Sequence, residues 1–247
     1  MKTLYQFPYS HFCEKARWAL DYKRQAYGIR NLLAGPHTAV TKKLAPKTCV
    51  PILVDGDTVI QGSGEIISYL DKLSPLPPLT PVDANLADEA LEWERYLDEH
   101  IGVSLRCWFY YHVLPLRPVA LKLLLQVAPW YGTALYALIF PKVKDAMTQA
   151  MNINAESAQE AERSLVGAFT RMNEALKDGR YLVGNQFSRA DLTACALLSQ
   201  FCLSSPQFDG LLPAPIAEFR RAHANQPFFQ WVRRIYADHR MPMRAAA

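Results

Sequence analysis

The sequence lacks several features that would mark particular classes of protein. It has no dense basic run interleaved with aromatics, and its net charge is only +4, so we expect no binding to nucleic acid. None of its five cysteines has C-x-x-C or zinc-finger spacing, so we expect no metal site. An odd, scattered set of cysteines also argues against a disulfide framework and favours a reducing compartment.

Targeting and membrane-spanning patterns are also missing. A strand-like pattern follows Met1 directly, without a signal-peptide pattern before it, and we therefore expect a cytoplasmic protein. Residues 123 to 141 carry no charge and approach the length needed to cross a bilayer. They include Pro129, which would break or kink a helix. We interpret the stretch as two shorter, buried or half-buried helices and expect no membrane association.

The first third of the chain alternates strand-like and helix-like segments. Apolar periodicity predicts strands at residues 2–7 and 29–33, a hairpin at 52–60, and helices at 12–23, 38–44 and 63–73. A strand–helix–strand unit favours a right-handed parallel pair of strands, and the hairpin adds antiparallel ones. We therefore expect a small mixed sheet covered by helices.

A change in composition follows. Four prolines between residues 74 and 83 predict a stiff linker, and everything after them looks helical. Helices are predicted at residues 83–105, 155–177, 188–203, 215–224 and 227–236. Ser188 and Asp191 have the spacing of a capping box, which is a structural feature. We expect three parts: a domain of residues 1–75, a linker of residues 76–84 and an all-helical domain of residues 85–247.

The first candidate for chemistry is Ser10, at the turn before a predicted helix. The positive end of the helix dipole and a donated hydrogen bond would both stabilise a bound thiolate there. Alternatively, Ser10 is only an N-cap. In a thiol–disulfide enzyme, Cys13 would pair with a cysteine at position 10. Serine stands there instead, which excludes a two-cysteine cycle within the loop.

Two further candidates lie beside the predicted hairpin. Pro51 directly precedes a strand, and a cis Val50–Pro51 bond would turn the Val50 backbone outward, toward an extended peptide ligand. A helix begins at Ser63, whose hydroxyl and neighbouring N–H groups could receive a carboxylate. A simple N-cap is again the alternative.

The order and spacing of these motifs resemble the soluble glutathione transferases of the serine type. The resemblance rests on Ser10 before Glu-Lys-Ala-Arg-Trp-Ala-Leu, Val-Pro before a hairpin, Gly-Ser-x-x-Ile-x-x-Tyr-Leu, and Tyr181-Leu182-Val183-Gly184 before Phe187-Ser188-x-x-Asp191. It covers nearly the whole chain, apart from residues 115–150. It implies an α+β thioredoxin-like N-terminal domain, an all-α C-terminal helical domain and a homodimer.

The resemblance also implies a function in detoxification and a set of site residues. Ser10 would activate the thiol of glutathione, the co-substrate, for attack on a small, largely apolar electrophile. The implied glutathione-binding residues are His37, Cys49, Val50, Pro51, Gly62 and Ser63. Lys43 is a rival to His37 at the glycyl end. Tyr9 and Tyr110 are alternative hydroxyls. Aromatic residues that could line the electrophile pocket are Trp108, Phe109, Tyr110, Tyr111, Trp130 and Tyr131.

The sequence departs from the family pattern before Ser63 and before Val50. Gly62 stands where glutamate or glutamine is usual, and Ala45-Pro46-Lys47-Thr48 replaces Asn-Pro-x-Gly. Two alternative functions remain open. One is a non-catalytic or membrane-associating relative, resembling the intracellular chloride channel proteins and motivated by the uncharged run. The other is thiol transfer or peroxide reduction through Cys13.

Overall fold

A four-stranded sheet forms the N-terminal part of the computed structural model, which describes residues 1–177, 179–203 and 209–241. Its strands are β1 (Lys2–Gln6), β2 (Tyr27–Asn31), β3 (Ile52–Asp55) and β4 (Thr58–Gln61), in the order β2-β1-β3-β4. β1 pairs parallel with β2 and antiparallel with β3. The predicted mixed sheet is confirmed. β2 begins earlier than predicted because Tyr27 pairs with Lys2.

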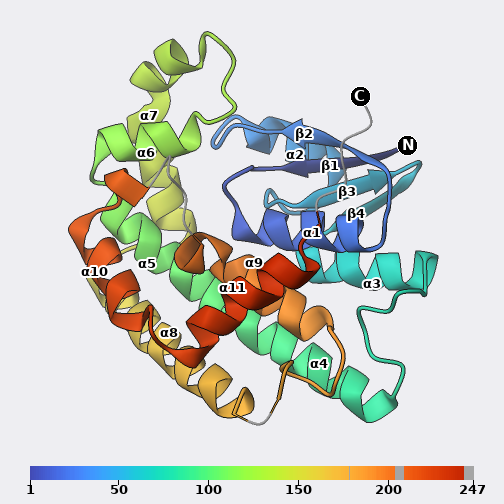
Figure 1. Cartoon of the computed structure of the whole chain (residues 1–247). Helices are drawn as coiled ribbons and strands as arrows, with labels where there is room; N and C mark the ends of the chain where they lie inside the picture. Colours follow the sequence, from blue (N-terminus) through green and yellow to red (C-terminus); the bar gives the residue numbers. More distant parts are fainter. Residues whose placement is uncertain (178, 204–208, 242–247) are drawn as a thin grey trace.

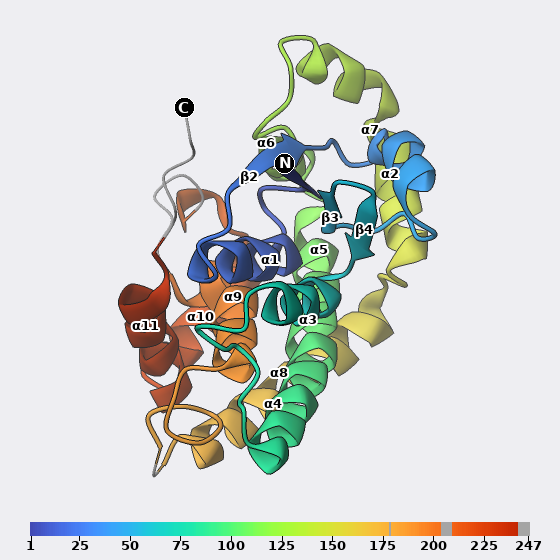
Figure 2. The same cartoon turned by 90° about the vertical axis from the view of Figure 1, so that its right-hand side faces the viewer.

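Three helices cover this sheet: α1 (His11–Tyr22), α2 (His37–Leu44) and α3 (Ser63–Leu73). α1 and α3 lie together on one side and α2 lies on the other (Figures 1 and 2). Apolar residues of α1 and α3, such as Leu20 and Ile66, are fully buried together with Leu4 and Leu53 of the strands. This arrangement is the thioredoxin-like domain that the sequence predicts.

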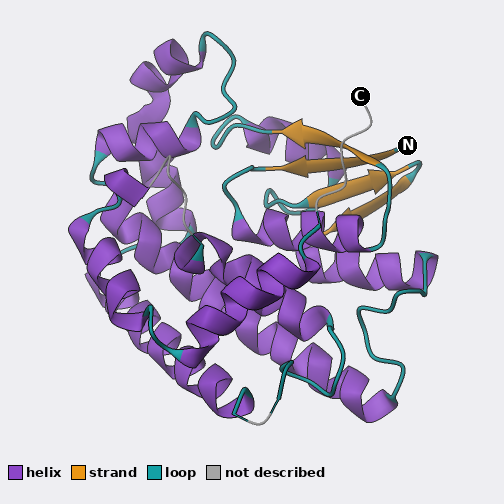
Figure 3. Cartoon of the chain, in the orientation of Figure 1, coloured by secondary structure: helices purple, strands orange, loops and turns teal. Residues whose placement is uncertain are grey.

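Helices make up the rest of the described chain (Figure 3). The first runs through α4 (Ala84–Leu97), a π-helical segment (Asp98–Val103) and α5 (Ser104–Val113) without a break. The prediction that this helix ends near Leu105 is wrong, because no proline follows until Pro115. Gly102 sits inside it where a Cβ would lie 2.5 Å from the Phe12 ring. The missing side chain lets α1 approach α5 closely.

Residues 115–150 form the two helices expected there, α6 (Arg117–Leu124) and α7 (Gly132–Ala150), with Pro129 between them. The expectation that they are half-buried is confirmed, since Leu124 and Tyr136 are almost fully buried. Other apolar residues of the segment face outward: Trp130 is 94% exposed and Leu138 is 81% exposed, and the pair of helices projects from the molecule (Figure 1). Within the described residues, no helix combines the length and apolarity needed to span a bilayer.

The remaining helices are α8 (Ala155–Ala175), α9 (Arg189–Cys202), α10 (Ala214–His223) and α11 (Pro227–His239), with a short 3-10 turn at Asp209–Leu211. α9 is almost entirely buried, and the predicted Ser188–Asp191 capping box begins it. Ion pairs connect the helices around α9. Arg189 donates to Glu94 of α4 at 2.6 Å, and Lys15 of α1 lies 2.8 Å from Asp98. These contacts fix α1 relative to α4 and α5.

Candidate functional site

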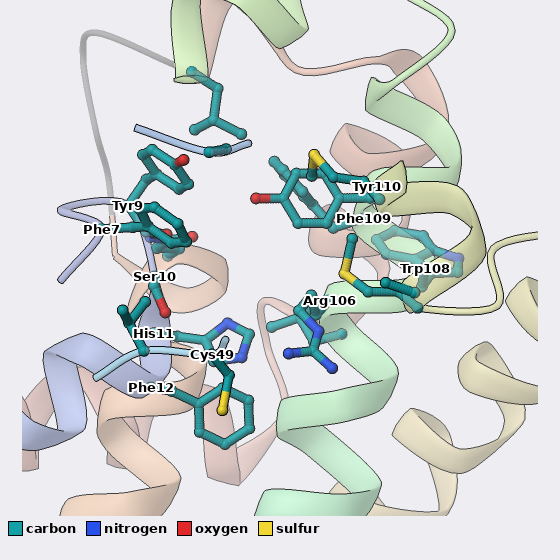
Figure 4. Close-up of a pocket in the computed structure, with 18 of the residues that line it drawn as sticks. Phe7, Tyr9, Ser10, His11, Phe12, Cys49, Arg106, Trp108, Phe109 and Tyr110 are labelled. Atoms are coloured by element: carbon teal, nitrogen blue, oxygen red, sulfur yellow. The ribbon is translucent and has the colours of Figure 1, made fainter. Parts of the chain in front are cut away.

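A cavity of about 600 Å³ lies where the N-terminal end of α1 and the loop before β3 face helices α5 and α7 (Figure 4). Its lining is mostly apolar and aromatic. The predicted site residues that it brings together are Ser10, His37, Cys49 and Val50. Pro51, Gly62 and Ser63 are not among the described residues that line it. Pro51 directly precedes β3, and Gly62 and Ser63 lie where β4 leads into α3. No group of His, Cys, Asp and Glu side chains suited to a metal ion occurs within the described ranges.

Ser10 is the N-cap of α1. Its Oγ accepts a hydrogen bond from the Cys13 backbone N–H at 3.3 Å, and its carbonyl accepts from the Glu14 N–H at 2.9 Å. A serine hydroxyl has one donor and two acceptor positions, and capping uses only an acceptor. The O–H of Ser10 therefore remains able to donate into the cavity. The cap and thiol activation, which the sequence presents as alternatives, are compatible.

The two cysteines near the turn differ in environment. Cys13 is fully buried, and burial raises the pKa of its thiol although the hydrogen bond to Ser10 opposes this. A buried thiol with a raised pKa is a poor nucleophile, so the geometry gives no support to chemistry through Cys13. Cys49 is exposed and lines the cavity.

The loop that carries Cys49 and Val50 is held by Gln61 of β4. The Gln61 side chain donates to the carbonyls of Lys47 and Cys49 at 2.7 and 2.9 Å and accepts from the Lys47 N–H at 3.1 Å. The Val50–Pro51 peptide is cis, as anticipated. Gln61 stands one place before the position at which the family usually has glutamate or glutamine. Its side chain holds the loop of residues 47–50 against β4.

Gly62 occupies a conformation that explains its departure from the family pattern. It is the residue before α3, with φ of 108° and ψ of 142°, a region almost restricted to glycine. A Cβ there would meet only Glu65 Cγ at 3.7 Å, so the backbone angle selects glycine rather than a lack of space. Ser63, the first residue of α3, is only 5% exposed.

His37 begins α2 and faces the cavity beside Phe7, with ring centroids 5.0 Å apart. Burial lowers its pKa, while hydrogen bonding to the Thr48 backbone opposes that shift. Its Nδ1 is buried and has no hydrogen-bond partner among the described residues. Lys43 is exposed on the same helix and is not part of the cavity lining in the described chain.

The aromatic predictions are correct for one part of the chain only. Trp108, Phe109 and Tyr110 of α5 line the cavity. Tyr111 turns instead toward α8. Trp130 and Tyr131 are exposed between α6 and α7, so their assignment to the pocket is wrong.

Tyr9 and Tyr110 both place hydroxyls at the cavity (Figure 4). Tyr9 stacks on Phe7 with ring centroids 5.5 Å apart. Burial raises the pKa of both phenols above the ordinary value. Each is therefore a neutral hydrogen-bond donor at physiological pH.

The sequence analysis misses several cavity residues, among them His11 and Arg106. His11 is 8% exposed, and burial, together with the nearby Arg106 charge, lowers its pKa to about 3. Arg106 belongs to α5, one residue beyond the predicted end of the helix. Their signal is weak in the sequence because a single histidine or arginine at a helix position has no motif around it.

Comparisons with known proteins identify the family of this fold. Two family models match the chain: "Glutathione S-transferase, N-terminal domain" over residues 4–78 and "Glutathione S-transferase, C-terminal domain" over residues 132–213. The second match includes all of α7, within the segment that the motif resemblance leaves uncovered. Glutathione S-transferase Z2 of Arabidopsis thaliana is 27% identical over 242 residues, covering 96% of this chain and 85% of that protein.

Solved structures show the same fold. A glutathione S-transferase domain-containing protein of Marinobacter aquaeolei is 18% identical, with a TM-score of 0.67 and coverage of 95% of this chain and 97% of that one. A glutathione S-transferase of Methylobacterium radiotolerans, in complex with glutathione sulfonate, is 18% identical with a TM-score of 0.60, covering 100% and 97%. At these identities the likeness is one of fold.

Proposed function

This chain belongs to the glutathione transferase family, and from that premise we propose that it transfers glutathione to a small, largely apolar electrophile. The observation that carries the proposal is the Ser10 hydroxyl at the N-terminus of α1, which lines an aromatic cavity of about 600 Å³. The cavity volume suits a small organic substrate. Membership of the family supports glutathione as the co-substrate.

In the proposed reaction, the Ser10 hydroxyl donates a hydrogen bond to the sulfur of bound glutathione. The α1 dipole adds favourable electrostatics, so the thiol loses its proton to water at a lower pH than in solution. The thiolate electron pair forms a C–S bond with the electrophilic carbon. The leaving group departs with the electron pair of the bond that breaks. Ser10 thus supplies pKa tuning, and the cavity supplies positioning.

Glutathione extends, in this proposal, from the cavity toward α3. The Val50 backbone pairs with its cysteinyl part, and Ser63 with the N–H groups of α3 receives the γ-glutamyl carboxylate. His37 approaches the glycyl end. The residues that shape the site between these contacts are Cys49, Pro51 and Gly62.

We extend the proposal to the organisation of the protein. Residues 1–75 form the glutathione-binding domain, and residues 85–247 form the helical domain that holds the electrophile. Residues 76–84 connect the two domains. Residues 178, 204–208 and 242–247 lie outside the described chain. A cytoplasmic homodimer with a detoxifying role fits the family and the unpaired cysteines.

The test is a glutathione conjugation assay with a neutral aryl halide, comparing wild type with Ser10→Ala and Ser10→Gly. A bound thiol whose pKa rises by one to two units would lose roughly 10- to 100-fold of its thiolate near neutral pH. We expect kcat/KM to fall by about that factor in both variants. Equal rates in all three proteins would reject the role of Ser10, and no conjugation by wild type would reject the function.

A further inference from the structure

Arg106, a half-buried cation, differs from the other cations that are withdrawn from solvent in the described chain. Lys15, Arg189 and Arg240 are each paired with a carboxylate, at 2.8, 2.6 and 2.6 Å. Arg106 has no ion pair with any described residue, and its Nε is buried without a hydrogen-bond partner there. Burial lowers the pKa of the guanidinium, which remains charged at physiological pH because an arginine starts from so high a value.

Among the residues that the structure describes, none with a compensating negative charge faces Arg106. The ionisable groups that face it are Tyr110, Cys49 and Cys107, together with His11, whose imidazole is neutral. Its Cζ lies 5.9 Å from the centroid of the Phe12 ring. A partly desolvated cation among neutral and aromatic groups is costly unless something else pairs with it.

The position of Arg106 makes a bound ligand the natural partner. Arg106 extends from α5 toward His11 and Cys49, across the cavity from Ser10 (Figure 4). Tyr110 lies four residues further along α5 and so shares its face of the helix; its hydroxyl also points into the cavity (Figure 4). The guanidinium and the neutral phenol together offer several hydrogen-bond donors, and neither group carries a negative charge.

We propose that the electrophile of this enzyme carries a carboxylate on a planar, otherwise apolar body, and that Arg106 binds this carboxylate while Tyr110 donates a further hydrogen bond. The guanidinium matches a carboxylate in bidentate geometry. The aromatic side chains of the cavity cover the rest of the molecule. The inference rests on the proposed function, since it names the substrate class of that same site.

Glutathione itself has two carboxylates, but the contacts proposed for them are with other residues. Ser63 and the start of α3 are not part of the cavity lining in the described residues, whereas His37 of α2 lines the same cavity as Arg106. If Arg106 bound glutathione instead, its loss would raise the KM for glutathione with every electrophile. The proposal requires the effect to depend on the charge of the second substrate.

The experiment compares 4-chloro-3-nitrobenzoate with its methyl ester, at saturating glutathione, in wild type, Arg106→Gln and Arg106→Lys. Each kcat/KM is divided by the rate of the uncatalysed reaction, because the ester is intrinsically more reactive. A charged hydrogen bond of about 1.5–3 kcal/mol corresponds to roughly 10- to 150-fold. We expect the corrected kcat/KM of wild type to be higher for the acid than for the ester by that factor. In Arg106→Gln this preference should disappear, because the KM for the acid rises.

The conservative variant and a control make the result specific. Arg106→Lys should keep part of the preference, since the charge remains but the bidentate geometry is lost. Arg163→Gln, on the exposed face of α8, should behave as wild type. A wild type without preference for the acid, or an Arg106→Gln variant that slows both substrates equally, would overturn the inference.

A binding measurement separates this inference from the proposed function. Calorimetry with unreactive 3-nitrobenzoate and its methyl ester reports on Arg106 without any conjugation. Acid binding that weakens about 10-fold or more in Arg106→Gln, with ester binding unchanged, supports the carboxylate site even if neither aryl halide is conjugated. Acid and ester that bind equally to wild type and variant reject it, even if the ester is conjugated.

Discussion

The Oγ of Ser10 accepts a hydrogen bond from the backbone N–H of Cys13 at 3.3 Å. This one contact begins α1 and holds the hydroxyl at the wall of the cavity. The same helix end supplies the dipole that favours an anion. Helix capping and the proposed thiol activation therefore depend on one side chain, and substitutions at Ser10 are expected to change both stability and activity.

Two substitutions at Ser10 separate these effects. Ser10→Ala removes the capping acceptor and should lower the free energy of unfolding by about 1 kcal/mol, whereas Ser10→Gly should cost only a few tenths. Both remove the hydroxyl and should lose activity equally. Urea unfolding and conjugation assays on the two variants check this. An activity that follows stability, with Ser10→Gly close to wild type, would contradict a chemical role for the hydroxyl.

Gly62 should tolerate no side chain. Gly62→Ala forces alanine to a φ of 108°, and we expect a loss of about 1–3 kcal/mol in the free energy of unfolding. Gly167 is the matched control. It lies exposed inside α8 with open space around it, so Gly167→Ala should stabilise by up to about 1 kcal/mol. Urea unfolding of both variants measures the two effects. If both substitutions changed the free energy of unfolding in the same direction, the explanation given for Gly62 would be contradicted.

Gln61 should influence glutathione binding without touching glutathione. Gln61→Leu removes three hydrogen bonds to Lys47 and Cys49 and frees the loop that carries Val50. We expect the KM for glutathione to rise by roughly 5- to 10-fold, equivalent to about one hydrogen bond, with kcat nearly unchanged. Steady-state kinetics at varied glutathione give both constants. A fall in kcat at constant KM would assign Gln61 a different role.

The stability of the protein should depend on pH through His11. Its folded pKa of about 3 lies below the value in the unfolded chain, so the unfolded state takes up the extra proton as the pH falls. Unfolding is therefore favoured at low pH. Between about pH 7.5 and pH 5.5 this single group should cost the folded state about 1.4 kcal/mol.

His11→Asn isolates this contribution. The variant starts from a different stability, but its loss between the two pH values should be smaller than that of wild type by about 1.4 kcal/mol. His37, His112 and His239, whose pKa values burial also lowers, contribute alike to both proteins and cancel in the difference. Parallel pH profiles for wild type and variant would show that His11 is not buried as a neutral group.

The sequence predicted features that depend on local residues. Strand pairing, the cap at Ser10 and the capping box at Ser188 follow from short motifs with a fixed spacing, whereas the cis bond at Pro51 was implied by the family resemblance. The family order of those motifs then predicted the thioredoxin-like and helical domains. The roles given to Ser10, His37, Cys49, Val50, Pro51, Gly62 and Ser63 stay predictions.

Features that depend on contacts between distant segments were not predictable. The cavity face of α5 requires the helix to continue through Gly102, and the Phe12 ring packs there only because Gly102 has no side chain. Nothing local distinguishes Arg106 from a surface arginine. The apolar character of Trp130 and Leu138 likewise predicts burial, whereas their position on the projecting pair α6 and α7 exposes them.

The most direct test of the account is a pH titration of the glutathione thiolate while it is bound to the protein. The ultraviolet absorbance of the thiolate is followed in wild type and in Ser10→Gly, at glutathione concentrations that saturate each. We predict a midpoint at least one unit below the ordinary cysteine value of about 8.5 in wild type, and a return toward that value in the variant. The same midpoint in both proteins would contradict the central claim that the Ser10 hydroxyl activates glutathione.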